Sequence, residues 1–251
     1  MRIPHDFSQL VQVTYLGFNM HGCVITVKLP QGNCVALQQL NLNSCCKIFG
    51  LEYATELDMM QILEYQYIRG TLQWPACLPQ LREIFVAWPS CTPDRFYALP
   101  EVWRHYSNLE TICLPPFAAA EFPHWLTELQ RLKHLEMESP VFPKFPKCLS
   151  QLVGLEHLDL SGIETMLTQD IVGLAELPRL TELNFGQMLC AEEVDTEFDE
   201  GQKHLDDEEE EHIEQLEQAL ESRAVPMYKE EGCLRFNFCI AQRRHLKCHS
   251  I

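Results

Sequence analysis

Residues able to bind a metal ion or to move a proton recur at nearly constant intervals between His134 and Asn184. His134 and His157 are 23 residues apart, and so are Glu136 and Asp159. Asn184 follows Asp159 after a further 25 residues. If these residues occupy neighbouring strands, their side chains can touch, because adjacent strands lie ~4.8 Å apart. Two histidines and two carboxylates can bind a divalent metal, but polar surfaces are also usual in repeat proteins, and the sequence favours the polar surface.

A second set of metal-binding residue types lies near the C-terminus, at Cys239, His245, Cys248 and His249. Its spacing does not match a closed zinc pattern such as C-x2-C with H-x3-5-H. The sequence also contains no G-x-S-x-G, no phosphate-binding glycine loop and no H-E-x-x-H. We therefore predict no catalytic residue, no metal and no cofactor.

The interval near 23 residues reflects a repeated template, apolar-x-x-apolar-x-x-apolar-x-apolar. Its clearest copies are Leu129/Leu132/Leu135/Met137, Leu152/Leu155/Leu158/Leu160 and Leu177/Leu180/Leu183/Phe185. The second anchor residues of eight copies are Val13, Leu37, Met60, Leu81, Leu109, Leu132, Leu155 and Leu180, which gives steps of 24, 23, 21, 28, 23, 23 and 25 residues. Eight copies in register predict a repeat array.

The template has a direct physical meaning. The last two anchors alternate with polar residues, which is the periodicity of a strand, and the first two indicate a short helical turn. One unit cannot bury its apolar stripe alone, so units must stack into a solenoid. An apolar-Pro pair lies nine residues before the second anchor in four repeats, at Pro4, Pro100, Pro123 and Pro146. Proline at this position suits the start of a helical turn.

The runs FPHWLTELQRLKHLEME and FPKCLSQLVGLEHLDLSG resemble the intracellular leucine-rich repeats of plants and related eukaryotes. These include the plant Ras-group-related class and the repeat region of disease-resistance proteins. The resemblance covers roughly residues 3 to 188. It implies an α/β leucine-rich-repeat solenoid, or horseshoe, with a concave parallel β-sheet and short helices or turns on the convex side. It also implies protein binding on the concave sheet without enzymatic activity.

Some residues depart from this family. Its Asn or Cys three positions after the last strand anchor is matched by Cys45, but the corresponding residues elsewhere are Phe117, Pro140, Ile163 and Met188. At those turns, either the regular packing is lost or other residues supply the bonds. The 28-residue step predicts a longer convex loop over 89–96, and the alternation in VITVKLPQGN predicts an extra strand followed by a turn at 31–33.

Strand alternation predicts which side chains face a partner, because the anchors point inward and the residues between them point to the concave surface. The first strands offer Tyr15, Asn41 and Glu64 among others. The predicted partner-binding residues are Tyr67, Glu83, Phe85, Trp88, Thr111, His134, Glu136, Glu138, His157, Asp159, Ser161, Glu182, Asn184 and Gln187. Tyr67, Phe85 and Trp88 would form an aromatic patch of the kind found at binding hot spots, unless Trp88 packs within its loop. The acidic balance of the later strands would match a basic segment of a partner protein.

The net charge of -17 is concentrated in one segment. Residues 192–221 hold fifteen Asp and Glu against Lys203, a net charge of -14, which leaves -3 for the rest of the chain. Such a charge disfavours nucleic acids and anionic membranes as partners. The end of the segment predicts a helix from about Asp207 to Ser222, either a polar linker helix lying on the solenoid end or an acidic docking element. Alternation over 233–240 predicts a final capping strand, followed by a basic tail.

These features divide the chain into a solenoid over residues 1–190, an acidic loop and helix over 191–224, and a capping strand with a basic tail over 225–251. We expect a non-catalytic protein-binding scaffold. The alternatives are an acidic regulatory adaptor, since the acidic leucine-rich nuclear proteins are similar, and an enzyme. The N-terminus lacks the apolar run of a signal peptide, and no stretch has the ~18 apolar residues of a spanning helix. The twelve scattered cysteines favour reduced thiols over a secreted disulfide scaffold. We expect a cytoplasmic location, with the nucleus as the alternative.

Overall fold

The computed structural model describes residues 12–17, 25–28, 36–42, 45–49, 59–66, 74, 76, 78–87, 99–114, 122–137, 142–161, 163, 169–186 and 207–229. These residues fall into two compact units. The first holds the described elements from β1 to β7, and the second holds those from η3 to β11. Both units consist of the parallel strands and short helical turns that the template predicts, so the chain has the predicted leucine-rich-repeat solenoid fold.

In the first unit, five parallel strands lie next to one another in sequence order. They are β1 (Tyr15–Gly17), β3 (Gln39–Leu42), β5 (Ile62–Gln66), β6 (Glu83–Ala87) and β7 (Thr111–Leu114). Their register aligns the third anchor of every repeat: Leu16, Leu40, Leu63, Ile84 and Ile112. The last four of these side chains are at most 1 % exposed. The anchors therefore build the core that the period predicts.

A separate two-stranded parallel sheet pairs β2 (Ile25–Lys28) with β4 (Cys45–Phe49). The extra strand predicted from VITVKLPQGN is confirmed as β2. β4 was not predicted: Cys45, expected to bond a turn, begins this strand and pairs with Ile25. The predicted turn at 31–33 and the loop at 89–96 lie outside the described residues.

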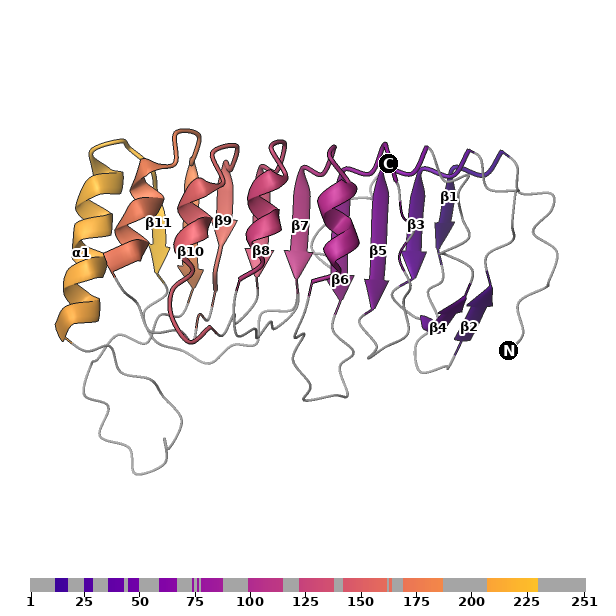
Figure 1. Cartoon of the computed structure of the whole chain (residues 1–251), viewed down its shortest axis with the longest axis horizontal. Coiled ribbons are helices and arrows are strands. Elements are labelled where there is room, and N and C mark those ends of the chain that lie inside the picture. Colours follow the sequence, from indigo (N-terminus) through magenta and orange to yellow (C-terminus); the bar gives the residue numbers. More distant parts are fainter. Residues whose placement is uncertain are drawn as a thin grey trace, which may run out of the picture. The chain divides into compact units, whose positions relative to one another are not determined.

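The second unit has four parallel strands in sequence order (Figure 1). They are β8 (His134–Met137), β9 (His157–Asp159), β10 (Glu182–Gly186) and β11 (Met227–Lys229). The helical segments η3 (His124–Glu128), η4 (Lys147–Gln151), η5 (Gln169–Glu176) and α1 (Asp207–Glu221) form a row beside these strands, each next to its sequence neighbour. With the strands of the first unit, β8, β9 and β10 complete the eight predicted repeat strands.

Proline begins three of the helical turns, as the sequence predicts. Pro100, Pro123 and Pro146 directly precede η2 (Glu101–His105), η3 and η4, with extended backbone angles. Each proline carbonyl accepts a hydrogen bond of 3.0 Å from the third residue after it. The missing proline N–H costs nothing here, because the first N–H groups of a helical turn have no partner within it. Pro4 lies outside the described residues.

Neighbouring repeats are joined by a shared carbonyl at the start of each strand. The carbonyl of Lys133 accepts the N–H groups of Glu156 and His157 at 2.8 and 2.9 Å. The carbonyl of Glu156 in turn accepts those of Thr181 and Glu182 at 2.8 and 3.2 Å. This pattern gives these backbone groups hydrogen-bond partners within the protein, and it fixes the register of β8, β9 and β10.

The turn after β9 shows how the repeat manages without the family's Asn. Ile163 occupies that position, and its own N–H donates to the carbonyl of Leu160 at 3.1 Å. The N–H of Leu160 donates to the carbonyl of Asn184 in the next repeat at 2.7 Å. The backbone therefore supplies bonds at this turn. Phe117, Pro140 and Met188 lie outside the described residues.

α1 confirms the helix predicted from about Asp207 to Ser222. Its first turn carries Asp207 and three glutamates, which favour the positive end of the helix dipole. Its apolar stripe, Ile213, Leu216 and Leu220, is buried, and the helix packs against η5. The helix thus lies against the last repeat turn, as the linker-helix prediction has it.

Beyond α1 the chain adds a strand to the sheet. β11 runs parallel to β10 and pairs Met227 with Leu183. Sequence reasoning expects a strand later, over 233–240, but those residues lie outside the described part of the chain. The domain boundaries drawn from the sequence therefore stay predictions.

Candidate binding surface on strands β8 to β10

One face of β8, β9 and β10 carries six side chains that alternate with the buried anchors. They are His134, Glu136, His157, Asp159, Glu182 and Asn184. All six are half-buried, whereas Leu135, Leu158 and Leu183 between them are at most 1 % exposed. The register aligns His134 with His157 and Glu182, and it aligns Glu136 with Asp159 and Asn184. The sheet therefore brings together the two polar rows that the repeat period predicts. We call these six residues the polar face.

The first row contains two stacked histidines. The rings of His134 and His157 have centroids 4.5 Å apart and planes 19° apart. Nδ1 of His157 lies 2.9 Å from Oε2 of Glu182, within hydrogen-bonding distance. The row thus links three adjacent strands through side chains whose backbones are already fixed by the ladder.

The second row is a network centred on Asp159. Nδ2 of Asn184 donates to Oδ2 of Asp159 at 2.9 Å and to Oγ of Ser161 at 3.1 Å. The backbone N–H and the hydroxyl of Ser161 both donate to Oδ1 of Asp159, the former at 2.8 Å. Both carboxylate oxygens are therefore engaged, and the side chains hold defined positions before any partner arrives.

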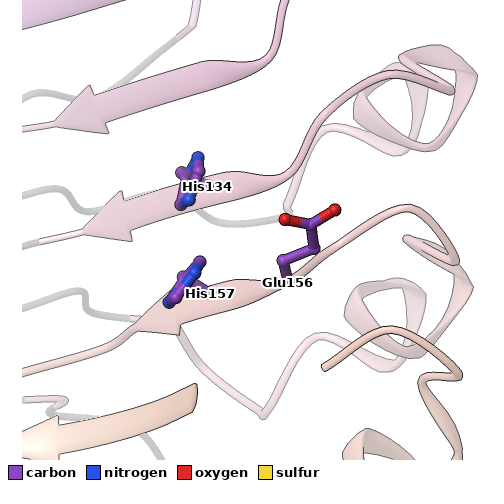
Figure 2. Close-up of side chains that lie close together, drawn as sticks. All are labelled: His134, Glu156 and His157. Carbon is purple, nitrogen blue, oxygen red and sulfur yellow. The ribbon is translucent and has the colours of Figure 1, made fainter. Parts of the chain in front are cut away.

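Glu156 is a member of this region that sequence reasoning did not find. It lies one residue before β9 and is half-buried. Oxygen and nitrogen atoms of His134, Glu156 and His157 lie within 4.8 Å of one another, and Figure 2 shows the two rings side by side with Glu156 at the start of β9. The sequence pointed to Glu136 and Asp159 as the carboxylates near the histidines, because strand alternation assigns faces only within a strand.

The first unit holds a similar but smaller polar row. Nδ2 of Asn41 donates to Oε2 of Glu64 at 2.6 Å across β3 and β5. Partial burial and the nearby Glu64 carboxylate raise the pKa of Tyr15, although half of that side chain is exposed. Both effects disfavour the tyrosinate anion.

The other predicted partner-binding residues differ in their surroundings. Glu83 and Phe85 are half-buried on β6. Thr111 is buried, with 7 % of its surface exposed, and so offers little surface to a partner. Tyr67, Trp88, Glu138 and Gln187 lie outside the described residues, and with them most of the predicted aromatic patch.

Solved structures that resemble this fold include bacterial leucine-rich-repeat proteins. An internalin (inlF) from Listeria monocytogenes has a TM-score of 0.53 and 16 % sequence identity, over 80 % of this chain and 50 % of its own. Internalin C2 (inlC2) from the same organism has a TM-score of 0.50 and 19 % identity, over 69 % of this chain and 71 % of its own. The present chain thus spans half of the first internalin's length. No protein-family model and no curated protein matches the sequence.

These similarities establish the leucine-rich-repeat fold. They do not establish the plant-type subclass that the sequence resembles. Within the described ranges, no helix is long and apolar enough to cross a membrane.

Proposed function

We propose that the chain is a non-catalytic scaffold that recognises a protein partner through the open face of its repeat sheet. The observation that carries this proposal is the polar face of β8, β9 and β10. Its side chains are half-exposed, and cross-strand hydrogen bonds hold several of them in place. A surface that is ordered before binding loses less conformational entropy when a partner docks.

Charge suggests which kind of partner fits. Three of the six residues on the polar face are carboxylates, namely Glu136, Asp159 and Glu182, and none is Lys or Arg. Opposite charges across an interface speed association and select partners. We therefore propose a protein with a basic segment, bound in the cytoplasm or nucleus.

The absence of a water-excluded cleft at the polar face supports a binding role over catalysis. General acid–base and electrostatic catalysis gain most in a site shielded from water. The side chains of His157 and Glu182 are instead 41 % and 46 % exposed. A hollow of about 450 Å³ near the end of α1 is lined in part by Glu156, Arg179 and Arg223. The Arg223 guanidinium donates to the carbonyls of Ala175 and Leu177, so it holds the backbone there.

Charge reversal tests the proposal. Glu136→Lys and Asp159→Lys should each weaken capture of lysine- and arginine-rich peptides on an array, and the double variant should abolish it. The binding should also weaken with rising salt, because exposed charges are screened. Glu176→Lys makes the same charge change at an exposed position on η5 and should leave binding intact. Equal capture by the double variant and the wild type would refute the polar face as the binding surface.

A second candidate function rests on α1. Its exposed side chains include Asp207, Glu208, Glu210, Glu211, Glu214 and Glu221, so the docked helix presents a strongly acidic surface. This favours an acidic adaptor that binds through the helix. If deletion of residues 192–212 abolishes binding while Glu136→Lys and Asp159→Lys do not, the adaptor replaces the polar-face proposal.

A further inference from the structure

Three potential metal ligands meet where β8 and β9 begin. His134 and His157 are cross-strand partners, and Glu156 directly precedes His157. We propose that His134, Glu156 and His157 bind a divalent transition metal ion of the zinc class, and that Glu182 positions His157 for it. The site goes beyond protein binding, and it uses a carboxylate that the sequence alone did not single out.

The backbone that carries these ligands is held from both sides. The N–H groups of Glu156 and His157 donate to the carbonyl of Lys133, and the carbonyl of Glu156 accepts two N–H groups from the start of β10. Ligands mounted on fixed strands keep their mutual distances better than ligands on loops do. The metal therefore needs to reorganise side chains only.

The separations are close to those of a metal site. One nitrogen or oxygen atom of each residue lies within 4.8 Å of those of the other two, whereas Zn–N bonds of about 2.0–2.1 Å in a tetrahedral site put ligand atoms roughly 3.3 Å apart. Rotations that move half-exposed side chains by about an ångström close this difference. The rings of His134 and His157 are now 19° from parallel, so their lone pairs do not converge. Binding must therefore break the ring stack.

Glu182 supplies the partner that metal-binding histidines usually have. Nδ1 of His157 lies 2.9 Å from Oε2 of Glu182, so Nε2 is the nitrogen left for a metal. A carboxylate on the second ring nitrogen fixes the tautomer and orientation of such a ligand.

The ligand set selects the metal class. Two imidazoles and one carboxylate suit zinc and its neighbours, whereas Ca²⁺ and Mg²⁺ prefer oxygen ligands alone. Three protein ligands leave a fourth position. All three residues are half-exposed, so we assign that position to water.

Zinc uptake by the isolated full-length chain tests the site. The sequence holds 10 His and 12 Cys, so the informative quantity is the number of zinc equivalents that a variant loses in calorimetric titration after EDTA treatment. His134→Ala and His157→Ala should each lose one equivalent, and Glu156→Gln should bind that equivalent more weakly. His124→Ala removes an exposed histidine of η3 and should lose none.

Co²⁺ reports the ligand type at the same site. The near-ultraviolet and visible spectrum of the wild type minus that of His157→Ala should show d–d bands without a thiolate charge-transfer band. Glu182→Gln should weaken binding by 10–100-fold, as expected for an outer partner of a metal ligand, while circular dichroism stays unchanged. The proposal is overturned if the folded double variant His134→Ala/His157→Ala takes up as many zinc equivalents as the wild type, with equal affinity. It is also overturned if the difference spectrum shows thiolate ligands. Neither result depends on a protein partner, so the two proposals fail separately.

Discussion

His157 and Glu182 are 25 residues apart in the sequence, yet Nδ1 of His157 lies 2.9 Å from Oε2 of Glu182. The pair spans β9 and β10 in direct register. The pair shows that the repeat period brings side chains at matching strand positions of successive repeats into contact.

This pair should contribute modestly to stability. Both side chains are more than 40 % exposed, and partly solvated cross-strand pairs contribute about 0.2–1 kcal/mol. A double-mutant cycle with His157→Ala and Glu182→Ala, followed by urea unfolding, should give a coupling free energy in that range. A cycle of Glu182→Ala with His124→Ala is the control, and an equal coupling in both cycles would contradict the contact.

The end of α1 should be improved by glycine. Val225 N–H donates to the Leu220 carbonyl at 3.1 Å, and Ala224 N–H donates to the Glu221 carbonyl at 3.0 Å. These two bonds form a Schellman motif, whose penultimate residue is left-handed and usually glycine. Here that residue is Ala224, with φ of 55°. Because a left-handed L-residue costs about 1–2 kcal/mol, Ala224→Gly should raise the free energy of unfolding by up to about 1 kcal/mol.

Ala219→Gly is the matched control for this change, since Ala219 lies inside α1. Glycine in a helix interior destabilises by about 1 kcal/mol. The two substitutions should therefore shift the urea midpoint in opposite directions. A shift of the same sign would show that the left-handed conformation of Ala224 does not destabilise the folded protein.

The third-anchor row should dominate stability in the second unit. Leu158 is 1 % exposed and lies between Leu135 and Leu183 in the register. Leu158→Ala removes buried methyl groups and leaves a cavity, so it should cost about 2–5 kcal/mol in urea unfolding. Val153→Ala, at a residue that is 50 % exposed, should change stability by less than about 0.5 kcal/mol. Similar effects of both substitutions would contradict the assigned core.

Cys148 should react slowly in the folded protein. Burial raises the pKa of its thiol above the usual value, and a backbone hydrogen bond only partly opposes this. Because the thiolate is the nucleophile, iodoacetamide at pH 8 should modify Cys148 more slowly than the half-buried Cys113, as followed by peptide mass spectrometry. Equal rates in the folded protein would contradict the burial of Cys148.

The same shift makes stability depend on pH. The pKa of the Cys148 thiol is higher in the folded state than in the unfolded state. The stabilising contribution of the neutral thiol is therefore complete below the unfolded-state pKa, and it is lost as the pH rises from there through the folded-state pKa. The wild type should therefore lose more stability in alkaline solution than Cys148→Ala does.

The regular part of the fold was predictable because the same apolar anchor positions recur in every repeat. Leu135, Leu158 and Leu183 fix strand position, register and buried face at once, since a shift of one residue would expose them all. The polar face followed from the same alternation. The proline positions were predictable as well, because Pro123 and Pro146 share one offset from their anchors.

The remainder could not be read from the period. β4 and β11 belong to no repeat copy, so their pairing with neighbouring strands decides them. Glu156 precedes its strand, where alternation no longer says which way a side chain points. Its position depends on how the backbone enters β9. There the N–H of Glu156 donates to the preceding repeat, and the carbonyl of Glu156 accepts two N–H groups from the following repeat.

The shared carbonyls between repeats have a mechanical consequence. Lys133 and Glu156 each hold the next strand through two bonds from one oxygen, so each repeat is tied to its neighbour at the same point. A force that pulls the chain from its last described strand would break these ties one after another, rather than together. Extension should then occur in steps of about 75 Å, the contour length of 23 residues at the extended rise. Under force, the second unit would therefore unfold sequentially, one repeat at a time.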